Sequence, residues 1–253
     1  KKNIRLENID VSNCHTTGGN ILVGGNTENI TIIDSESYFG SISVFGGSNI
    51  LLKRISAHDY HQPVMMQNPR GTFRNIALEN IHIYNCYPDG KIGHGDGDYQ
   101  AISFRGNVSN MRLSDIRVDA PARDGIALYQ HRFNRWDGVE VKRCYVNNAH
   151  DRTKGIHSGG ILLGGDSRRG AMEPKDNIRI HHNVIHGCAG YGMRIKAYPS
   201  SSKDSAIRVW HNFTYDNGMP NAMHGVIAAP PDVENYAEAA AALKASIIAN
   251  TPG

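Results

Sequence analysis

The stretch Tyr191-Gly192-Met193-Arg194-Ile195-Lys196-Ala197-Tyr198 has the pattern of a β-strand with two different faces. Side chains alternate between the two faces of a strand, so Met193 and Ile195 share one face. Arg194 and Lys196 share the other face, about 7 Å apart along the strand. Two charged side chains do not suit a core, but they are well placed to bind a carboxylate. The stretch therefore predicts a strand with an apolar inner face and a cationic outer face.

The same short phrase, an aliphatic-x-aliphatic triplet after a small residue, recurs eight times along the chain. The copies are Asn20–Val23, Ser41–Val44, Pro63–Met66, Ala101–Phe104, Gly125–Leu128, Gly160–Leu163, Gly192–Ile195 and Gly225–Ala228. A second phrase of the type N-I-x-I lies between several of them, at Asn29–Ile32, Asn49–Leu52, Asn75–Leu78, Asn110–Leu113 and Asn177–Ile180. The first copies are separated by a period of about 22 residues, which is typical of a solenoid.

These repeats predict an all-β fold, a right-handed single-stranded parallel β-helix of about eight coils that spans residues 1–230. An antiparallel sandwich would not repeat the same strand phrase at a fixed period. The segment Asp232–Asn250 differs, because it is rich in alanine and its apolar residues have helical spacing. We expect residues 231–253 to form a short C-terminal helix that docks on the stack or caps it.

Composition excludes several classes of protein. The chain has 253 residues and a formal net charge of +3, so a nucleic-acid-binding protein is not expected. No apolar run reaches the roughly 18–20 residues that a membrane span needs. The four cysteines, Cys14, Cys86, Cys144 and Cys188, lack metal-ligand spacing. We expect them to be free thiols that are buried in turns.

Stacked coils place equivalent outward residues in columns about 4.8 Å apart. The long coils add residues on both sides of the first-phrase strand, and such loops form the walls of a groove. The pattern brings seven polar side chains to the four central coils: Asp98, Arg105, Asp124, Tyr129, His157, Arg194 and Lys196. We expect the small residues Ser103, Ala127 and Gly164 to leave room for a ligand between them. Asp96 lies in a predicted groove wall, and Tyr60 and His61 lie at the N-terminal end of the groove, where Tyr60 could stack on a sugar ring.

Four consecutive coils resemble the polygalacturonase family of pectin hydrolases, which belongs to the pectin-degrading superfamily of right-handed parallel β-helices. The family carries the motifs N-T-D, D-D, G-H-G and R-I-K in successive coils. Their counterparts are Asp96–Asp98, Arg123–Asp124, Gly155–Gly160 and Arg194–Lys196, and the resemblance covers Asp96–Tyr198. It implies catalytic roles for Asp98, Asp124, His157 and Lys196. The matched motif implies a substrate-binding role for Arg194. We expect the same role for Arg105, Arg123, Tyr129, Asp96, Tyr60 and His61 from their positions in the predicted groove.

The chain departs from the family pattern at three positions. Arg123 stands where the family has the aspartate that acts as general acid. In a strict alignment Gln100 takes the place of the aspartate of N-T-D, and Gly159 takes the place of the histidine of G-H-G. Asp98 and His157 then match only if their turns are two residues longer. The family's assignment of roles therefore does not transfer intact to this chain.

Three functions remain open at this stage. The first is hydrolysis of an acidic, uronate-containing polysaccharide without a cofactor, which needs an acid and a base carboxylate such as Asp98 and Asp124. The second is β-elimination on the same kind of polymer, in which Lys196 or His157 acts as base and Asp98 and Asp124 could hold Ca²⁺. The third is a glycan-binding or glycan-depolymerising phage tailspike-like protein, which would be a homotrimer.

The predicted partner is the same in all three cases, an acidic polysaccharide. An enzyme on such a polymer is expected to be secreted, either extracellular or periplasmic. A tailspike-like protein would instead lie on a virion surface.

Overall fold

The structure, a computed structural model, describes residues 2–12, 19–25, 27–60, 62–86, 100–129, 135–149, 159–164, 175–196, 207–218, 222–224, 227–229 and 236–252. It is built almost entirely of strands. Their bounds are β1 Lys2–Glu7, β2 Asp10–Ser12, β3 Ile21–Gly24, β4 Glu28–Tyr38, β5 Ile42–Phe45, β6 Ser48–His58, β7 Val64–Tyr84, β8 Gln100–Asp119, β9 Asp124–Tyr129 and β10 Trp136–Lys142. The chain continues with β11 Tyr145–Asn147, β12 Gly159–Gly164, β13 Lys175–His181, β14 Val184–His186, β15 Tyr191–Lys196, β16 Arg208–Trp210, β17 Phe213–Tyr215, β18 Ala222–His224, β19 Ile227–Ala229 and the helix α1 Tyr236–Ala249.

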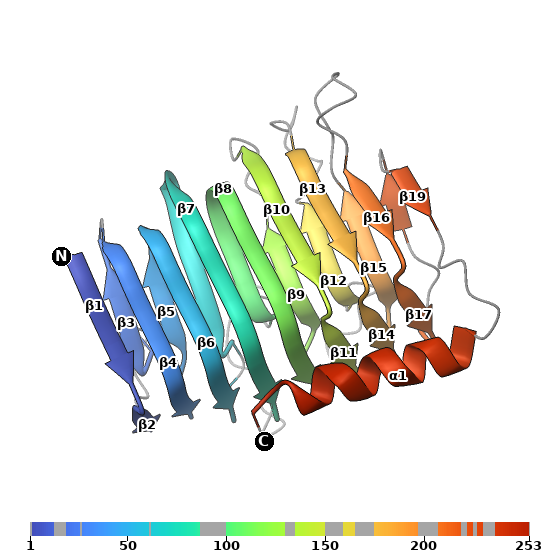
Figure 1. Cartoon of the computed structure of the whole chain (residues 1–253), viewed down its shortest axis with the longest axis horizontal. Helices are drawn as coiled ribbons and strands as arrows, with labels where there is room; N and C mark the ends of the chain where they lie inside the picture. The colour runs from blue at the N-terminus through green and yellow to red at the C-terminus, as the bar shows by residue number, and fades with distance from the viewer. Residues whose placement is uncertain are drawn as a thin grey trace.

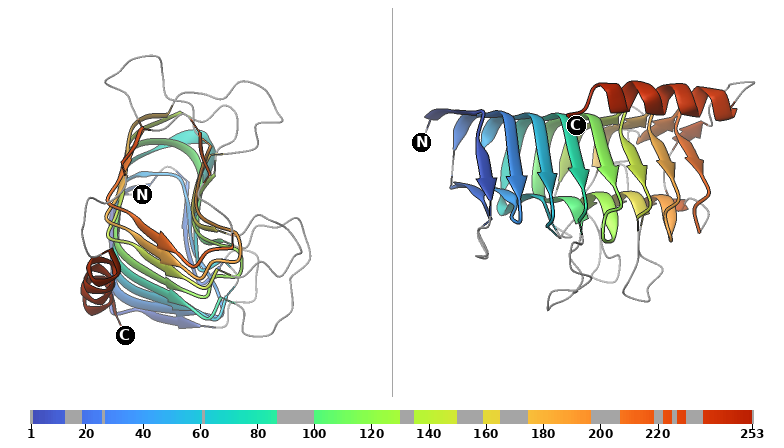
Figure 2. Two further views of the ribbon diagram at one scale, coloured as in Figure 1. Left: turned by 90° about the vertical axis from the view of Figure 1, so that its right-hand side faces the viewer. Right: turned by 90° about the horizontal axis from the view of Figure 1, so that it is seen from below.

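Each coil contributes strands to three parallel sheets, and every recorded strand pairing is parallel. The first sheet contains β3, β5, the starts of β7 and β8, β9, β12, β15 and β18. The second contains β1, the starts of β4 and β6, the middle parts of β7 and β8, and β10, β13, β16 and β19. The third contains β2, the ends of β4, β6, β7 and β8, and β11, β14 and β17. The predicted parallel β-helix is thus confirmed (Figures 1 and 2).

The register of the first sheet agrees with the sequence repeat in seven of the eight copies. Leu22, Ser43, Met65, Ser103, Ala127, Leu162 and Arg194 form one continuous column of Cα partners. The eighth copy was placed wrongly. The first-sheet strand after β15 is β18, whereas β19, which holds Ile227 and Ala228, pairs with β16 of the second sheet. Strands of both sheets bury alternate residues, so an aliphatic-x-aliphatic phrase alone does not tell them apart.

The core is a stack of aliphatic side chains at matching positions of successive coils. In the first sheet Ile42, Val64, Ile102, Ile126 and Ile161 are all 0% exposed. Three cysteines are buried free thiols, as predicted: Cys86, Cys144 and Cys188. Burial raises the pKa of Cys86 and Cys144 to about 12 and that of Cys188 to about 11, so all three remain protonated at neutral pH. Cys14 lies outside the described residues.

The asparagine of the second phrase occupies the corner that leads into the second sheet. Asn29, Asn49, Asn75 and Asn110 all have positive φ, between 54° and 62°. Asparagine adopts this left-handed conformation more readily than most residues. Each Nδ2 donates to the Oδ1 of the asparagine one coil earlier; Asn49 donates to Asn29 over 2.8 Å and accepts from Asn75 over 2.8 Å. The phrase therefore encodes both the corner and a ladder of side-chain hydrogen bonds.

Replacing Asn49 separates these two contributions. Asn49→Gly removes the two ladder hydrogen bonds but keeps a residue that tolerates positive φ. Asn49→Ala removes the bonds and also forces an alanine into the left-handed region, which costs roughly 1–2 kcal/mol. We expect Asn49→Ala to lower the free energy of unfolding by about 1 kcal/mol more than Asn49→Gly, measured by urea denaturation. Equal losses would mean that the corner conformation contributes nothing.

Helix α1 lies along the flank of the stack and not over one of its ends (Figure 2, left), so of the two expected arrangements the structure shows docking. It packs on the third sheet, where a second apolar cluster joins Tyr145, Val184 and Phe213 to Ala240 and Ile247. The physical reason is the composition of the outward column. Its C-terminal coils are apolar, whereas the equivalent positions of the first three coils are Asp10, Glu36 and Ser56. The C-terminal end of the helix is held by Asn80, whose Nδ2 donates to the Asn250 carbonyl over 2.7 Å.

No helix among the described residues is both long and apolar enough to cross a membrane.

Candidate functional site

Asp124 lies at the start of β9, on the first sheet, between the equivalent positions Gln100 of β8 and Gly159 of β12. Its side chain is almost completely buried, with 1% of the residue exposed. The Nε of Arg123 lies 3.7 Å from its Oδ2. No described residue donates a hydrogen bond of standard geometry to this buried Oδ2. The result is a carboxyl group out of water beside a guanidinium group.

Burial raises the pKa of Asp124 from an ordinary 3.8 to about 7. The charge of Arg123, the side-chain amide of Gln100, the backbone N–H of Gly159 and the charge of Arg194 all favour the carboxylate and oppose this rise. The Gln100 amide contributes only a loose contact, because its Nε2 makes no hydrogen bond of standard geometry with described residues. Desolvation outweighs the four favourable interactions, so Asp124 can both take up and release a proton near neutral pH.

Arg194 and Arg105 lie on the same sheet, on either side of Asp124 along the stack. Arg194 belongs to β15, where it is the Cα partner of Leu162, and its Cζ lies 5.3 Å from the centre of the Tyr191 ring. Arg105 belongs to β8 and is the Cα partner of Tyr129. Both arginines are half-buried. The cationic outer face predicted from the sequence is therefore present at Arg194.

The face between these cations is not the open surface that the small residues predicted. Ser103 and Ala127 are 0% exposed and Leu162 is 8% exposed, although they belong to the outward column and not to the core cluster. Among the described outward residues of this sheet, exposed side chains lie in the first coils, where Leu22 is 57% and Phe45 is 38% exposed. The expectation that small side chains leave room for a ligand at the central coils was wrong for this structure, because these positions are covered.

The other predicted site residues differ in how much of them the structure describes. Tyr60 follows β6, two coils before Asp124, and burial raises the pKa of its hydroxyl. Strand positions alone are described for Tyr129 and Lys196, which lie at the ends of β9 and β15. Asp96, Asp98, His157 and His61 lie outside the described residues. The catalytic set predicted from the sequence is thus represented by Asp124 and by the backbone position of Lys196.

Sequence reasoning missed the polar ladder that ends at Asp124. Gln62 Nε2 donates to Gln100 Oε1 over 3.4 Å, and Gln100 is the Cα partner of Asp124. All three side chains are buried. The sequence contained a signal for this ladder. Gln62, Gln100 and Asp124 each stand two residues before the inward aliphatic residue of their own coil. The ladder places buried polar side chains at equivalent positions of three neighbouring coils, the last of which is that of Asp124.

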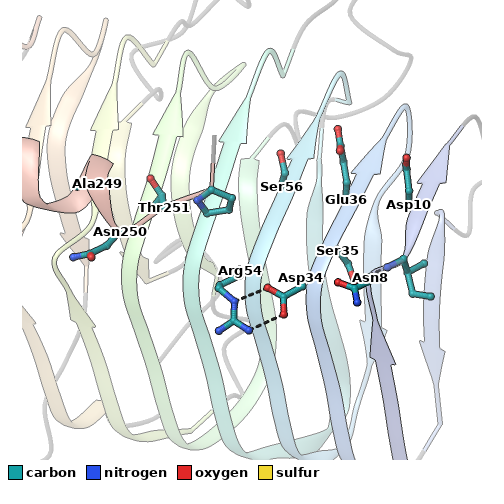
Figure 3. A pocket seen from close by; sticks show the side chains of 12 residues that line it. Asn8, Asp10, Asp34, Ser35, Glu36, Arg54, Ser56, Ala249, Asn250 and Thr251 are labelled. Carbon is teal, nitrogen blue, oxygen red and sulfur yellow. Dashed lines mark hydrogen bonds and ion pairs between the residues drawn. The ribbon is translucent and has the colours of Figure 1, made fainter.

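A separate hollow of about 590 Å³ lies on the third-sheet side of the first coils, next to the end of α1 (Figure 3). Its lining includes a bidentate ion pair in which Arg54 Nε and Nη2 contact the Asp34 carboxylate at 2.5 and 2.6 Å. Glu36 in the same lining contacts His58 Nε2 at 2.7 Å. Three of its four charged groups, Asp34, Glu36 and Arg54, are thus already paired. Neither here nor elsewhere do the described residues form a group of three or more His, Cys, Asp or Glu side chains able to hold a metal ion.

Comparison with known proteins gives support for the fold. No protein-family model matches the chain. No curated protein matches its sequence. Among solved structures, the crystal structure of pectate lyase Pel9A is similar, with a TM-score of 0.52 and 14% sequence identity over 92% of this chain and 70% of that chain. At this identity the likeness shows a shared parallel β-helix fold. The resemblance to polygalacturonases stays a prediction.

Proposed function

We propose that this chain binds and cleaves an acidic, uronate-containing polysaccharide, with Asp124 as the group that transfers a proton. The observation that carries the proposal is a buried carboxyl group with a pKa of about 7, placed beside Arg123 and within reach of the charge of Arg194. A proton-transfer group is most effective when its pKa is close to the working pH. Cations beside it favour a substrate that carries carboxylates. The fold shared with a pectate lyase is compatible with this proposal but does not carry it.

β-Elimination is the reaction to which the described residues contribute both necessary parts. A base removes the proton from C5 of a uronate, the C5 electrons form the C4–C5 double bond, and the bond from C4 to the glycosidic oxygen breaks. The leaving oxygen then takes up a proton. Asp124 would accept the C5 proton, while Arg194 and Arg123 would stabilise the substrate carboxylate as it becomes enolate-like. Asp124 is 1% exposed, so the proposed reaction requires a conformation in which the polymer can reach this carboxyl group.

Hydrolysis is the second candidate, and the order of the short motifs from Asp96 to Lys196 favours it. An inverting hydrolase needs a second carboxylate roughly 6.5–9.5 Å from the first. Asp98 is the predicted second carboxylate, and it lies outside the described residues. Asp124 would then be the general acid, because a carboxyl group with a pKa of about 7 is still largely protonated in a weakly acidic medium.

A role for Ca²⁺ at Asp98 and Asp124 also stays a prediction. Calcium binds six to eight oxygen ligands. At Asp124 the nearest described charged group is the guanidinium of Arg123, which repels a cation. We therefore assign no step of the proposed reaction to a metal ion.

A digest of acidic polysaccharides distinguishes the candidates. Polygalacturonate, its methyl ester and alginate are incubated with the protein, with and without EDTA. Ultraviolet absorbance of unsaturated products and new reducing ends are followed in parallel. We expect both signals to rise together on polygalacturonate, since elimination creates a double bond with each new end. New ends without absorbance would indicate hydrolysis. Binding without either signal would contradict the enzyme proposal and favour a tailspike-like glycan receptor.

Where the protein acts follows from the same proposal. Polymers of this kind lie outside the cytoplasm, so the proposed site of action is extracellular or periplasmic. A trimer is expected only for the tailspike-like alternative, and the mass of the protein in solution would test it.

A further inference from the structure

Six basic side chains gather on the outer face of the second sheet and on the corner that follows it, across the neighbouring strands β10, β13 and β16. Their inward neighbours Ile178, Ile180 and Val209 are buried in the core, so the basic residues of these strands point outward. The group, which we call the Arg–His surface, consists of Lys142, Arg179, His181, His182, Arg208 and His211. It belongs to a different sheet from Asp124 and to a face that the proposed reaction does not use.

Positive charge on the Arg–His surface exceeds the negative charge that faces it. Among the described residues, one carboxylate forms ion pairs with this group: Glu140 is shared by Lys142 at 3.0 Å, His181 at 3.3 Å and Arg179 at 3.7 Å. Arg208 is exposed and forms no ion pair with any residue that the structure describes. It is also the direct Cα partner of Arg179 on the neighbouring strand. Like charges on directly opposite residues are destabilising, and an anion held between them would remove the repulsion.

The coils that precede β10 provide a contrast on the same sheet. There Glu79 lies between Lys53 and Arg112, and it forms ion pairs with both of them. Arg5 likewise pairs with Glu7 at 2.9 Å. The excess of positive charge is therefore a local property of β10, β13 and β16.

The positive charge of this surface also affects the pKa of one of its histidines, His182. Burial lowers the pKa of His182, and the positive charges of His181, His211, Arg143 and Lys142 lower it further. The Nδ1 atoms of His181 and His182 lie 2.8 Å apart, so one ring donates a hydrogen bond and the other accepts it. The two rings therefore cannot both be protonated in this arrangement. A bound polyanion would favour their charged forms.

An aromatic ring lies within this group of cations. Trp210 is a half-buried outward residue of β16 and stacks on His181, with ring centroids 4.3 Å apart and an angle of 13° between the planes. Tryptophan offers an apolar face with a polar edge, which suits the apolar face of a pyranose ring. Cations repeated at the strand spacing of about 4.8 Å suit a chain that carries regularly spaced carboxylates.

We propose that the Arg–His surface is a second binding site for acidic polysaccharide, separate from the first-sheet site, which holds the polymer while it is cleaved elsewhere. This inference rests on the proposed function for the identity of the polymer. A polysaccharide fits better than a nucleic acid for two reasons: the chain as a whole carries a formal net charge of only +3, and the basic surface spans only three strands, of which the first carries Glu140. A long basic stripe is the usual mark of a nucleic-acid site.

The test uses the full chain and polygalacturonate as the probe. The variant Arg179→Glu/Arg208→Glu reverses two charges, and the matched control Arg5→Glu reverses one exposed charge of the same outward column in the first coil. Affinity is measured by titration at two ionic strengths, and cleavage of the same polymer is recorded in parallel. Protection of His182 and His211 from acylation, read by mass spectrometry, localises the bound polymer. We expect the double variant to bind roughly tenfold more weakly, and the control to bind like the wild type.

Each result leads to one conclusion. Loss of affinity in the double variant, together with polymer-dependent protection of the two histidines, supports the surface even if the polymer is not cleaved. If the polymer binds in this way but is not cleaved, the proposed enzyme activity is wrong and the proposed binding site is still supported. Unchanged affinity in the double variant, or no protection, overturns the surface whatever the activity shows. Tighter binding of duplex DNA than of polygalacturonate at equal charge concentration would overturn the assignment to a polysaccharide.

Discussion

Asp124→Asn is expected to lower the rate of polysaccharide cleavage by at least a hundredfold while leaving the fold intact. An asparagine side chain has nearly the same shape and keeps an oxygen that accepts the Gly159 backbone N–H. It cannot take up or release the proton, and loss of a general acid or base typically costs 10²–10⁴ in rate. The measurement is the initial rate on polygalacturonate, or on whichever polymer the wild type cleaves. The matched control is Asp115→Asn, a corner aspartate paired with Arg143 at 2.7 Å and remote from the first sheet.

The same variant tests whether Asp124 is the buried group with the raised pKa. The folded-state pKa of about 7 exceeds the ordinary value of 3.8. Asp124 therefore contributes stability that is fully present below pH 4 and is lost as the pH rises toward 7. Asp124→Asn removes this dependence, so the variant should gain stability relative to the wild type between pH 5 and pH 8, measured by urea unfolding. Full activity in the variant would contradict the proposed role, and an unchanged pH profile of stability would contradict the raised pKa.

The fold could be predicted from the sequence because successive coils repeat the same kinds of residue at the same positions. Aliphatic triplets specify the strands, and the asparagine of the second phrase specifies the left-handed corner at positions such as Asn49 and Asn75. The helix was predicted as an element that docks on the stack or caps it, but the sheet on which it docks was not predicted. Its place depends on which outward residues of the third sheet are apolar, such as Val184 and Phe213, and this follows only from the register of distant strands.

The site was predictable in part for a related reason. Columns of outward residues placed Arg105 and Arg194 on one sheet, and the start of the strand added Asp124, because register converts sequence spacing into spatial neighbours. Burial could not be predicted in the same way. Ser103 and Ala127 read as small residues of an open groove, yet both are covered. Coverage depends on chain from elsewhere in the molecule, and no property of the strand itself reveals it.

The small residue before the strand phrase gives the second prediction of large effect. Gly125, Gly160 and Gly192 are equivalent residues of three successive coils. A Cβ at Gly160 would collide with the side chain of Ile185 and would lie 2.7 Å from the Gly192 carbonyl oxygen. A Cβ at Gly125 would lie 2.5 Å from Val146 Cγ1 and 2.8 Å from the Gly160 carbonyl oxygen. Side chains of the third sheet and the backbone of the next coil thus fill the space that a methyl group would need.

We therefore expect Gly160→Val to lower the free energy of unfolding by about 3 kcal/mol, because overpacking against backbone atoms cannot be relieved by a rotamer change. Gly24→Ala is the matched control on the same sheet, since its Cβ would meet nothing within 4 Å. It should change stability by about 0.5 kcal/mol or less. Urea denaturation measures both variants.

A double-variant cycle shows which neighbour resists the added side chain. If Ile185 carries part of the clash, Gly160→Ala combined with Ile185→Ala should destabilise less than the sum of the two single changes. Additive losses would place the whole cost on the Gly192 carbonyl, which cannot move without shifting the next coil. Either result ties a glycine of the sequence repeat to the distance between coils. That distance also sets the spacing of Asp124 and Arg194, because β9 and β15 are separated by β12, to which Gly160 belongs.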